Sequence, residues 1–280
     1  MYYYILDPHN LSLPRFEKLQ VELQGLLAEF NVTGEVGRVT ALRTISDLIE
    51  TASQRGAHTL IACGSDDTFN LMLALLKGRD FTLGFIPLTE NSYLGKILGA
   101  DSLHTAVKTI AARRIEKIDL ARAGNTYFIG SAEFGITGHD LQNVNLWNSF
   151  TSLSGKAMEL QIRIDNQYTI TAQTIGGAVV NSRMTSSADQ SLANPTDGYL
   201  DLLLLDALPK SAILRYKQDI IDNMLEKTPH SSVIKCQKIE FLEPRGLGLS
   251  IAGKVLTKFP ETVEIIPRRL KMIVGKNRTF

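Results

Sequence analysis

The chain has 280 residues, of which 44% are hydrophobic and 21% are charged, as expected of a globular protein with one large or two medium-sized domains. Its 30 Lys and Arg residues nearly cancel its 29 Asp and Glu residues, so no overall charge points to nucleic acid as a partner. Two cysteines give no disulfide framework, no apolar run approaches the roughly 20 residues of a membrane span, and the amino terminus lacks a secretory signal pattern, which together favour a cytoplasmic protein.

Strands and helices are predicted to alternate in the first part of the chain. A short apolar strand at residues 2–6 ends at Asp7-Pro8, and Pro14 opens a helix with one apolar face. The pattern then predicts a helix over 41–55, a strand over 58–63, a helix over 67–77, a strand over 81–86, and helices over 93–98 and 102–113. This alternation is typical of a doubly wound parallel sheet, which binds its ligands at the carboxyl ends of its strands.

From Ile115 onward the pattern changes to successive strands. Strands are predicted over 115–121, 126–131, 158–165, 168–174, 178–180, 199–205, 232–241, 248–251, 262–266 and 270–274, with one helical segment over 211–225. Asp165-Asn166-Gln167 is typical of a hairpin turn between two alternating runs. We therefore predict an N-terminal α/β domain over residues 1–114 and a mostly antiparallel β domain over residues 115–267.

The segment CGSDDTFN, residues 63–70, joins a predicted strand to a predicted helix. Many folds hold a phosphate at such a place, on the backbone N–H groups of a helix N-terminus. Phosphate-binding turns are normally rich in glycine, however, and this one carries two adjacent carboxylates, Asp66 and Asp67. The alternative interpretation is a helix cap, in which Ser65 or Asp66 is the N-cap and the acidic residues complement the helix dipole.

Three stretches, in their order and spacing, resemble motifs of the diacylglycerol kinase catalytic family, in particular its soluble bacterial lipid kinases. The family's GGDGTxNE turn corresponds to GSDDTFNL at 64–71, its IPLGTGNDFAxxLG motif to IPLTENSYLGKILG at 86–99, and its DDGLLDV-like segment to PTDGYLDL at 195–202. The resemblance extends over nearly the whole chain. It implies a C-terminal β-sandwich domain, a cleft between the two domains, and a last strand, near 268–280, that returns to the first domain. NAD kinases share the glycine-rich turn and a similar two-domain plan, and they are the nearest alternative family.

The resemblance implies ATP and Mg²⁺ as cofactors and a lipid hydroxyl of the diacylglycerol type as the phosphate acceptor. The candidate nucleotide-binding residues are those of the first two motifs, namely Gly64, Ser65, Asp66, Asp67, Thr68, Asn70, Glu90, Asn91 and Ser92. Ser65 and Asp67 stand where the family has glycines that let the backbone approach the phosphates. A Mg²⁺ ion bridging Asp66 or Asp67 to phosphate would offset the repulsion between these carboxylates and the nucleotide. In the second motif, capping of the next helix by Asn91 or Ser92 is the alternative.

The third motif is the best preserved, and the resemblance assigns it a structural Mg²⁺ ion. Asp197 and Asp201 are the candidate ligands, with Asp189 upstream as a further one, since Mg²⁺ prefers carboxylate and carbonyl oxygens. Pro-Thr-Asp-Gly is also an ordinary turn before a strand, so a turn without metal is the alternative.

The family's fourth element is an Asp-Gly-Glu turn, and the resemblance implies that its aspartate accepts the proton of the lipid hydroxyl. Here the matching turn reads Ala252-Gly253-Lys254, so no base stands at the expected position unless Asp206 or Glu243 supplies one from elsewhere. Two hypotheses follow: an ATP-dependent lipid kinase of unusual sequence, and a non-catalytic pseudokinase that binds nucleotide, lipid or a protein partner. An NAD kinase is a third alternative.

The C-terminal segment carries several basic residues that are candidates for peripheral contact with anionic lipid headgroups. They are Arg268, Arg269, Lys271, Lys276 and Arg278. A solvated charged face is the alternative for this run, and the oligomeric state has no signal in the sequence.

Overall fold

The computed structural model describes the chain except for residues 77–78, 91, 138–139, 142–156, 183–192, 222–223 and 252 and the side chain of Lys210. The described residues form two compact units. Unit 1 comprises residues 1–118 and 268–280, and unit 2 comprises residues 119–182 and 193–267. Two strands, β5 (Ile115–Ala123) and β15 (Glu261–Ile273), contribute residues to both units.

Unit 1 is built on a parallel sheet. Strand β1 (Tyr2–Leu6) pairs with β2 (Gly34–Arg38) on one side and β3 (Thr59–Gly64) on the other, β4 (Thr82–Pro87) pairs with β3, and residues 271–272 of β15 pair with β4. All of these pairs are parallel, as the strand–helix alternation predicts. Every residue of β3 and β4 is buried, which is the pattern of parallel strands covered on both faces.

Strand β2 is an element that the sequence pattern did not predict. Its sequence, GEVGR, has no run of apolar or β-branched residues, and only Gly37 is buried. The strand forms because its backbone continues the sheet at the outer side of β1. An edge strand of this kind carries almost no periodic hydrophobic signal, so the pairing with β1 is what specifies it.

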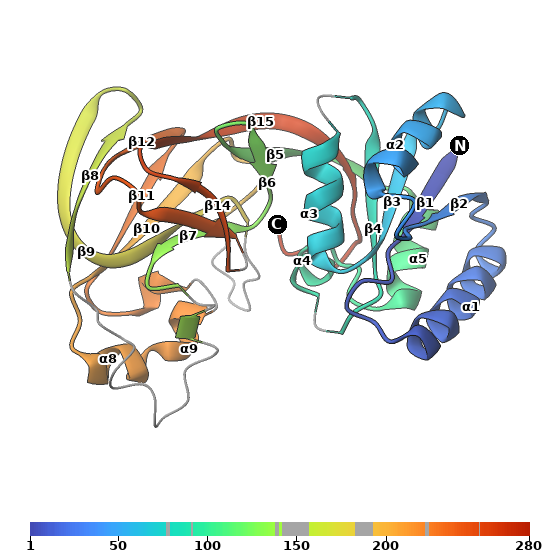
Figure 1. Cartoon of the computed structure of the whole chain (residues 1–280), viewed down its shortest axis with the longest axis horizontal. Coiled ribbons are helices and arrows are strands. Elements are labelled where there is room, and N and C mark those ends of the chain that lie inside the picture. The colour runs from blue at the N-terminus through green and yellow to red at the C-terminus, as the bar shows by residue number, and fades with distance from the viewer. Residues whose placement is uncertain are drawn as a thin grey trace. The chain divides into compact units, whose positions relative to one another are not determined.

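Five helices cover the sheet of unit 1 in the described ranges: α1 (Leu13–Glu29), α2 (Ile45–Gln54), α3 (Asp66–Leu75), α4 (Tyr93–Ile97) and α5 (Leu103–Ala112). Helix α2 packs against α3, and α1 packs against α5 (Figure 1). Helix α2 begins later than the predicted position 41 because Thr44 is its N-cap, with a capping box to Asp47. None of the helices in the described part of the chain is long and apolar enough to cross a membrane.

Unit 2 consists mainly of antiparallel strands. They are β5, β6 (Thr126–Phe128), β7 (Ser131–Gly135), β8 (Met158–Ile164), β9 (Tyr168–Val180), β10 (Leu200–Asp206), β11 (Ser231–Cys236), β12 (Lys238–Glu243), β13 (Gly248–Ile251), β14 (Lys254–Lys258) and the first part of β15. The pairs β8–β9, β9–β10, β10–β11, β8–β12 and β12–β15 are all antiparallel. The helical segment predicted over 211–225 is interrupted and forms α8 (Lys210–Arg215), α9 (Lys217–Ile221) and a 3₁₀ turn (Leu225–Lys227).

Several strand limits in unit 2 differ from the predicted ones. The strand predicted over 126–131 is two strands, β6 and β7, the strands predicted over 262–266 and 270–274 are one strand, β15, and β14 was not predicted. The two strands predicted over 168–174 and 178–180 are one strand, β9, because Gly176 and Gly177 continue the ladder where neighbouring backbone lies too close for a side chain. The single strand predicted over 232–241 is split at Gln237 into β11 and β12. At this break the carboxylate of Asp165 accepts hydrogen bonds from the backbone N–H groups of Gln237 and Lys238, both at 2.8 Å.

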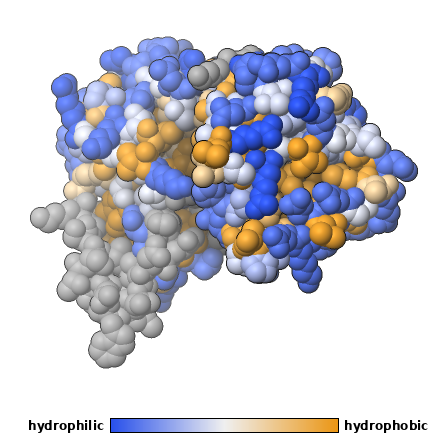
Figure 2. Space-filling model, turned by 45° about the vertical axis from the view of Figure 1, so that its right-hand side comes forward, coloured by the Kyte–Doolittle hydropathy of each residue, from blue (hydrophilic) through white to orange (hydrophobic). Residues whose placement is uncertain are grey.

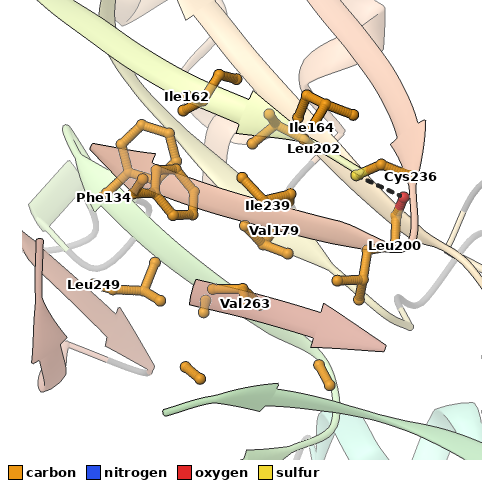
Figure 3. Close-up of a cluster of buried hydrophobic side chains, with 14 of the residues drawn as sticks. Phe134, Ile162, Ile164, Val179, Leu200, Leu202, Cys236, Ile239, Leu249 and Val263 are labelled. Carbon is orange, nitrogen blue, oxygen red and sulfur yellow. Dashed lines mark hydrogen bonds between the residues drawn. The ribbon is translucent and has the colours of Figure 1, made fainter. Parts of the chain in front are cut away.

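A large part of the core of unit 2 is a cluster of buried apolar side chains from the strands (Figure 3). Three aromatic rings lie together in it, and the rings of Phe241 and Phe259 are stacked with their centroids 4.3 Å apart. Phe134 contacts both of these rings. Burying this apolar area stabilises the β unit. On the molecular surface shown in Figure 2, apolar residues form separate groups among hydrophilic ones.

Candidate functional site

The carboxyl ends of the strands of unit 1 bring three chain segments to one edge of the sheet. Leu6 is in register with Cys63, and Gly64 is in register with Pro87. The residues that follow these strands, Asp7 and Ser65 among them, therefore start from neighbouring positions. This is the edge at which parallel α/β sheets bind their ligands, and the first two sequence motifs both lie here.

Residues 64–70 form the predicted turn from strand to helix. Ser65 is the N-cap of α3, and its hydroxyl accepts a hydrogen bond from the backbone N–H of Thr68 at 3.4 Å. In return, the hydroxyl of Thr68 accepts a hydrogen bond from the backbone N–H of Ser65 at 3.1 Å. A Cβ atom at Gly64 would collide with the side chain of Thr68, so this position requires glycine. The turn is thus closed by a capping box.

Asp7 joins the end of β1 to this turn. Its side chain is buried, and Oδ2 accepts a hydrogen bond of 2.7 Å from the hydroxyl of Thr68. Oδ1 accepts a second bond, of 3.0 Å, from the backbone N–H of His9, whose ring nitrogen Nδ1 lies at the same distance. The buried carboxylate of Asp7 therefore stabilises the turn, in addition to the carboxylates of Asp66 and Asp67 within it.

Asp66 connects the first and second motifs. Its carboxylate accepts hydrogen bonds from the hydroxyl of Ser92 and from the backbone N–H groups of Tyr93 at 2.8 Å and Leu94 at 3.2 Å. Ser92 is the N-cap of α4, and its hydroxyl accepts a bond of 2.9 Å from the N–H of Gly95. Asp66 therefore binds the N-terminus of α4, where a negative charge is favoured by the exposed N–H groups.

The electrostatics of the turn are set by two neighbouring carboxylates. Burial raises the pKa of Asp66 above its usual value. The hydrogen bonds from Ser92, Leu94 and Tyr93 act in the opposite direction, and the charge of Asp67 adds an upward contribution. Asp67 itself is exposed in the first turn of α3, and Asn70 is partly buried one turn further on. Any phosphate that approached these N–H groups would meet this negative charge.

The remaining candidates of the second motif are spread over different environments. Glu90 is highly exposed and forms an ion pair with Arg15 of α1, with Nη2 and Oε1 2.7 Å apart. Ser92 is buried as the cap of α4. Asn91 lies outside the described residues. Of the sequence-predicted nucleotide residues, the structure thus brings together those of residues 64–70 and Ser92, and it directs Glu90 to a surface ion pair.

The third motif forms a loop before β10 in unit 2, and it is held by carboxylates. Asp197 accepts a hydrogen bond of 2.9 Å from the N–H of Tyr199, and buried Asp201 accepts one from the N–H of Ala193. Asp119 of β5, which is fully buried, accepts a bond of 2.7 Å from the N–H of Gly198, and its own N–H donates to the carbonyl of Pro195. Asp189 lies outside the described residues.

A positively charged side chain, that of Lys235, also contacts this loop. The ammonium group of Lys235, on β11, lies 2.7 Å from Oδ2 of Asp197. Although burial lowers the pKa of Lys235, its hydrogen bond to Asp197 and the charges of Asp201 and Asp197 raise it by more, so the pKa lies above its usual value. Within the described ranges, no group of three or more His, Cys, Asp or Glu side chains is arranged to hold a metal ion.

The residue at the expected base position, Ala252, is outside the described residues, and it follows the last residue of β13. Gly253 has a positive φ of 77°, and Lys254 begins β14. Of the two alternative carboxylates, Glu243 forms an ion pair with Arg245, whereas Asp206 is the last residue of β10. Among the C-terminal basic residues, Lys271 and Arg278 form ion pairs with Asp80 and Glu116.

Three residues of these sites were not predicted from the sequence: Asp7, Asp119 and Lys235. Asp7 carries a weak signal, since it directly follows a predicted strand and precedes a proline. Asp119 and Lys235 lie far along the chain from the loop that they contact, and only the pairing of β10 with β11 and the packing of β5 bring them to it.

Comparisons with known proteins agree with this architecture. A crystal structure of a diacylglycerol kinase from Bacillus anthracis superposes with a TM-score of 0.77 at 15% identity and covers 99% of this chain and 98% of that one. An NAD kinase from Archaeoglobus fulgidus, solved in complex with ATP, gives a TM-score of 0.52 at 12% identity and covers 99% of this chain and 94% of that one. The protein therefore has the two-domain α/β-plus-β fold of these kinases, as predicted.

Sequence comparison adds matches over part of the chain. Residues 14–123 match the model of the diacylglycerol kinase catalytic domain. A curated protein from Cronobacter sakazakii, "Probable lipid kinase YegS-like", is 35% identical over 118 residues. That match spans 40% of this chain and 38% of the relative's own length. This confirms the resemblance for the first two motifs, at 64–71 and 86–99, which lie inside the matched residues.

Proposed function

We propose that this protein is a lipid kinase-family pseudokinase, in which ATP-dependent phosphorylation of a diacylglycerol-like hydroxyl is very slow or absent. One observation carries the proposal: the side chains of the phosphate turn are engaged in capping. Ser65 and Thr68 cap α3, and the carboxylate of Asp66 binds the N-terminus of α4. A turn that satisfies its own N–H groups with side-chain oxygens offers fewer of them to a nucleotide phosphate.

The charge of the turn supports the same proposal. A phosphate beside Asp66 and Asp67 would meet two carboxylates, and two unit charges about 4 Å apart repel by about 1 kcal/mol in water and about 4 kcal/mol at the effective dielectric near a protein surface. A divalent cation bound together with the nucleotide would offset this repulsion, and the side chains of Asp66 and Asp67 are the groups that would hold it.

The sequence of the fourth element supports the proposal in a second way, because it lacks the expected proton acceptor. Alanine at position 252 cannot accept the proton of an acceptor hydroxyl, and a positioned base contributes about 10²- to 10⁴-fold to such a reaction. Positioning and charge neutralisation carry more of phosphoryl transfer than the base does. The proposal therefore allows slow residual transfer.

An active lipid kinase is the second candidate function. It is favoured by the match of residues 14–123 to the catalytic domain model and by the relatives, whose names describe a lipid kinase and a diacylglycerol kinase. For either candidate we infer a cytoplasmic protein, in keeping with the buried free cysteines, and headgroup contact through exposed Arg268 and Arg269.

A thermal unfolding screen tests whether the turn still binds nucleotide. The protein is mixed with ATP, ADP or NAD, each with and without Mg²⁺. A ligand at a hundredfold excess over its dissociation constant stabilises the fold by about 2.7 kcal/mol, a shift that is readily measured. We expect a small shift with ATP or ADP that depends on Mg²⁺. If no nucleotide changed the melting temperature, the nucleotide site would be rejected, and a lipid or a protein would be left as the ligand. A large shift with NAD would favour the NAD kinase alternative.

A further inference from the structure

The loop at residues 193–201 concentrates negative charge in unit 2. Three carboxylates serve it: Asp119, which is fully buried; Asp201, which is 2% exposed; and Asp197, which is partly exposed. Each accepts a hydrogen bond from a backbone N–H of the loop, from Gly198, Ala193 and Tyr199 respectively. Buried carboxylates also need a compensating positive charge, because burial removes the water that would otherwise solvate them.

With the ammonium group of Lys235 in place, the donor set of this loop does not fit a Mg²⁺ ion. Magnesium demands near-octahedral coordination by about six oxygen atoms, which must point at one centre. Here one oxygen of each carboxylate is already directed at an N–H group, and the second oxygen of Asp197 is directed at an ammonium group 2.7 Å away. That ammonium group would also repel a divalent cation.

Lys235 places a positive charge next to the carboxylates of this loop. In the antiparallel pair of β10 and β11, Lys235 is directly opposite Asp201, so their side chains project from the same face of the sheet. From there its ammonium group reaches the carboxylate of Asp197, and it lies 5.8 Å from the centroid of the Tyr199 ring. One side chain thus faces both carboxylates that the sequence suggests as metal ligands.

We propose that Lys235 is a built-in counter-ion of the loop at residues 193–201 and takes the place of a bound divalent cation. The loop is held by a charge on the chain itself, and its stability is independent of Mg²⁺. This inference concerns unit 2 alone, and it stands whether or not the turn at residues 64–70 binds nucleotide.

The test is thermal unfolding without nucleotide, in chelator and in increasing Mg²⁺. It compares the wild type with Lys235→Met, which keeps most of the length of the side chain and removes its charge. The wild type should melt at the same temperature in both conditions. Lys235→Met should melt about 2–4 °C lower in chelator and should recover stability as Mg²⁺ is added, because the carboxylates then accept an external cation. Lys235→Arg, which keeps the charge, should melt close to the wild type and stay insensitive to Mg²⁺.

Lys271→Met is the matched control. Its ammonium group lies at the same 2.7 Å from a carboxylate, that of Asp80, and its side chain is 40% exposed against 38% for Lys235. Because the side chain of Asp80 is 72% exposed, water solvates it when the lysine is removed. We therefore expect a smaller loss of stability in Lys271→Met and no response to Mg²⁺.

Two results would overturn the proposal. One is saturable Mg²⁺ binding to the wild type, measured by calorimetric titration and abolished by Asp197→Asn, which would make the loop a metal site despite Lys235. This titration needs only the wild type and Asp197→Asn, so it decides the question even if Lys235→Met does not fold. The other is a Lys235→Met protein that Mg²⁺ does not stabilise, because the lysine would then not occupy the position of a cation.

Discussion

Asp67 occupies a position at which the diacylglycerol kinase catalytic family, which the motifs resemble, has glycine. Its exposed carboxylate lies in the first turn of α3. We predict that Asp67→Gly binds ATP and ADP about tenfold more tightly. The substitution removes a charge that repels phosphate, by about 1 to 4 kcal/mol for charges about 4 Å apart, and it lets the backbone approach the ligand. Calorimetric titration of the variant and the wild type measures the difference.

Asp67→Asn is the matched control for this experiment, because it removes the charge and keeps the size of the side chain. It should show part of the gain, and the remainder in Asp67→Gly is then due to the backbone. Equal or weaker binding by both variants would contradict the prediction. In that case Asp67 either does not face a phosphate or holds a metal ion that the nucleotide needs.

The side chain of Asp66 links helices α3 and α4. Its carboxylate accepts bonds from Ser92, Tyr93 and Leu94, which form the N-terminus of α4. We predict that Asp66→Ala lowers the free energy of unfolding by about 1–3 kcal/mol, because the N–H groups of this short helix lose their acceptor. Urea unfolding of the purified variant measures this loss.

Glu90→Ala serves as the control at the same sheet edge. The side chain of Glu90 is 80% exposed and pairs with Arg15 on the surface. Exposed ion pairs contribute about 0–1 kcal/mol, so its removal should change the free energy of unfolding by less than that of Asp66. If the two variants were equally stable, the carboxylate of Asp66 would not be what holds α4.

The elements that could be predicted from the sequence are those with a strong local pattern. Strands β3 and β4 are continuous apolar runs, and their order with α3 and α5 predicts the parallel sheet. Strand β2 has no such run. The sequence of β9 predicts two strands because two glycines interrupt its pattern. At the site, the turn at residues 64–70 was predicted from its motif. The contacts of Asp7, Asp119 and Lys235 depend on strand register and packing, which a local pattern does not encode.

At the scale of the whole molecule, our proposal combines a fold shared with diacylglycerol kinases with altered residues in the phosphate turn and at the expected base position. By the resemblance, Ser65 and Asp67 stand where the family's phosphate turn has glycines, and Ala252 stands where the family has the base. These losses should compound, because one limits the approach of the nucleotide and the other limits proton transfer. We therefore predict that Ala252→Asp alone restores little activity and that the triple variant with Ser65→Gly and Asp67→Gly restores more. Glycine is tolerated at an N-cap at a cost of only a few tenths of a kcal/mol, so the triple variant should still fold.

The central claim is tested most directly by the incorporation of radiolabelled phosphate from ATP into diacylglycerol in mixed micelles. The unmodified protein should give incorporation at or barely above the background without enzyme, and the triple variant should exceed it. A base contributes about 10²- to 10⁴-fold, which sets the scale of the gain expected once the nucleotide can bind. Rapid, sustained incorporation by the unmodified protein would contradict the pseudokinase proposal and would require a base outside position 252.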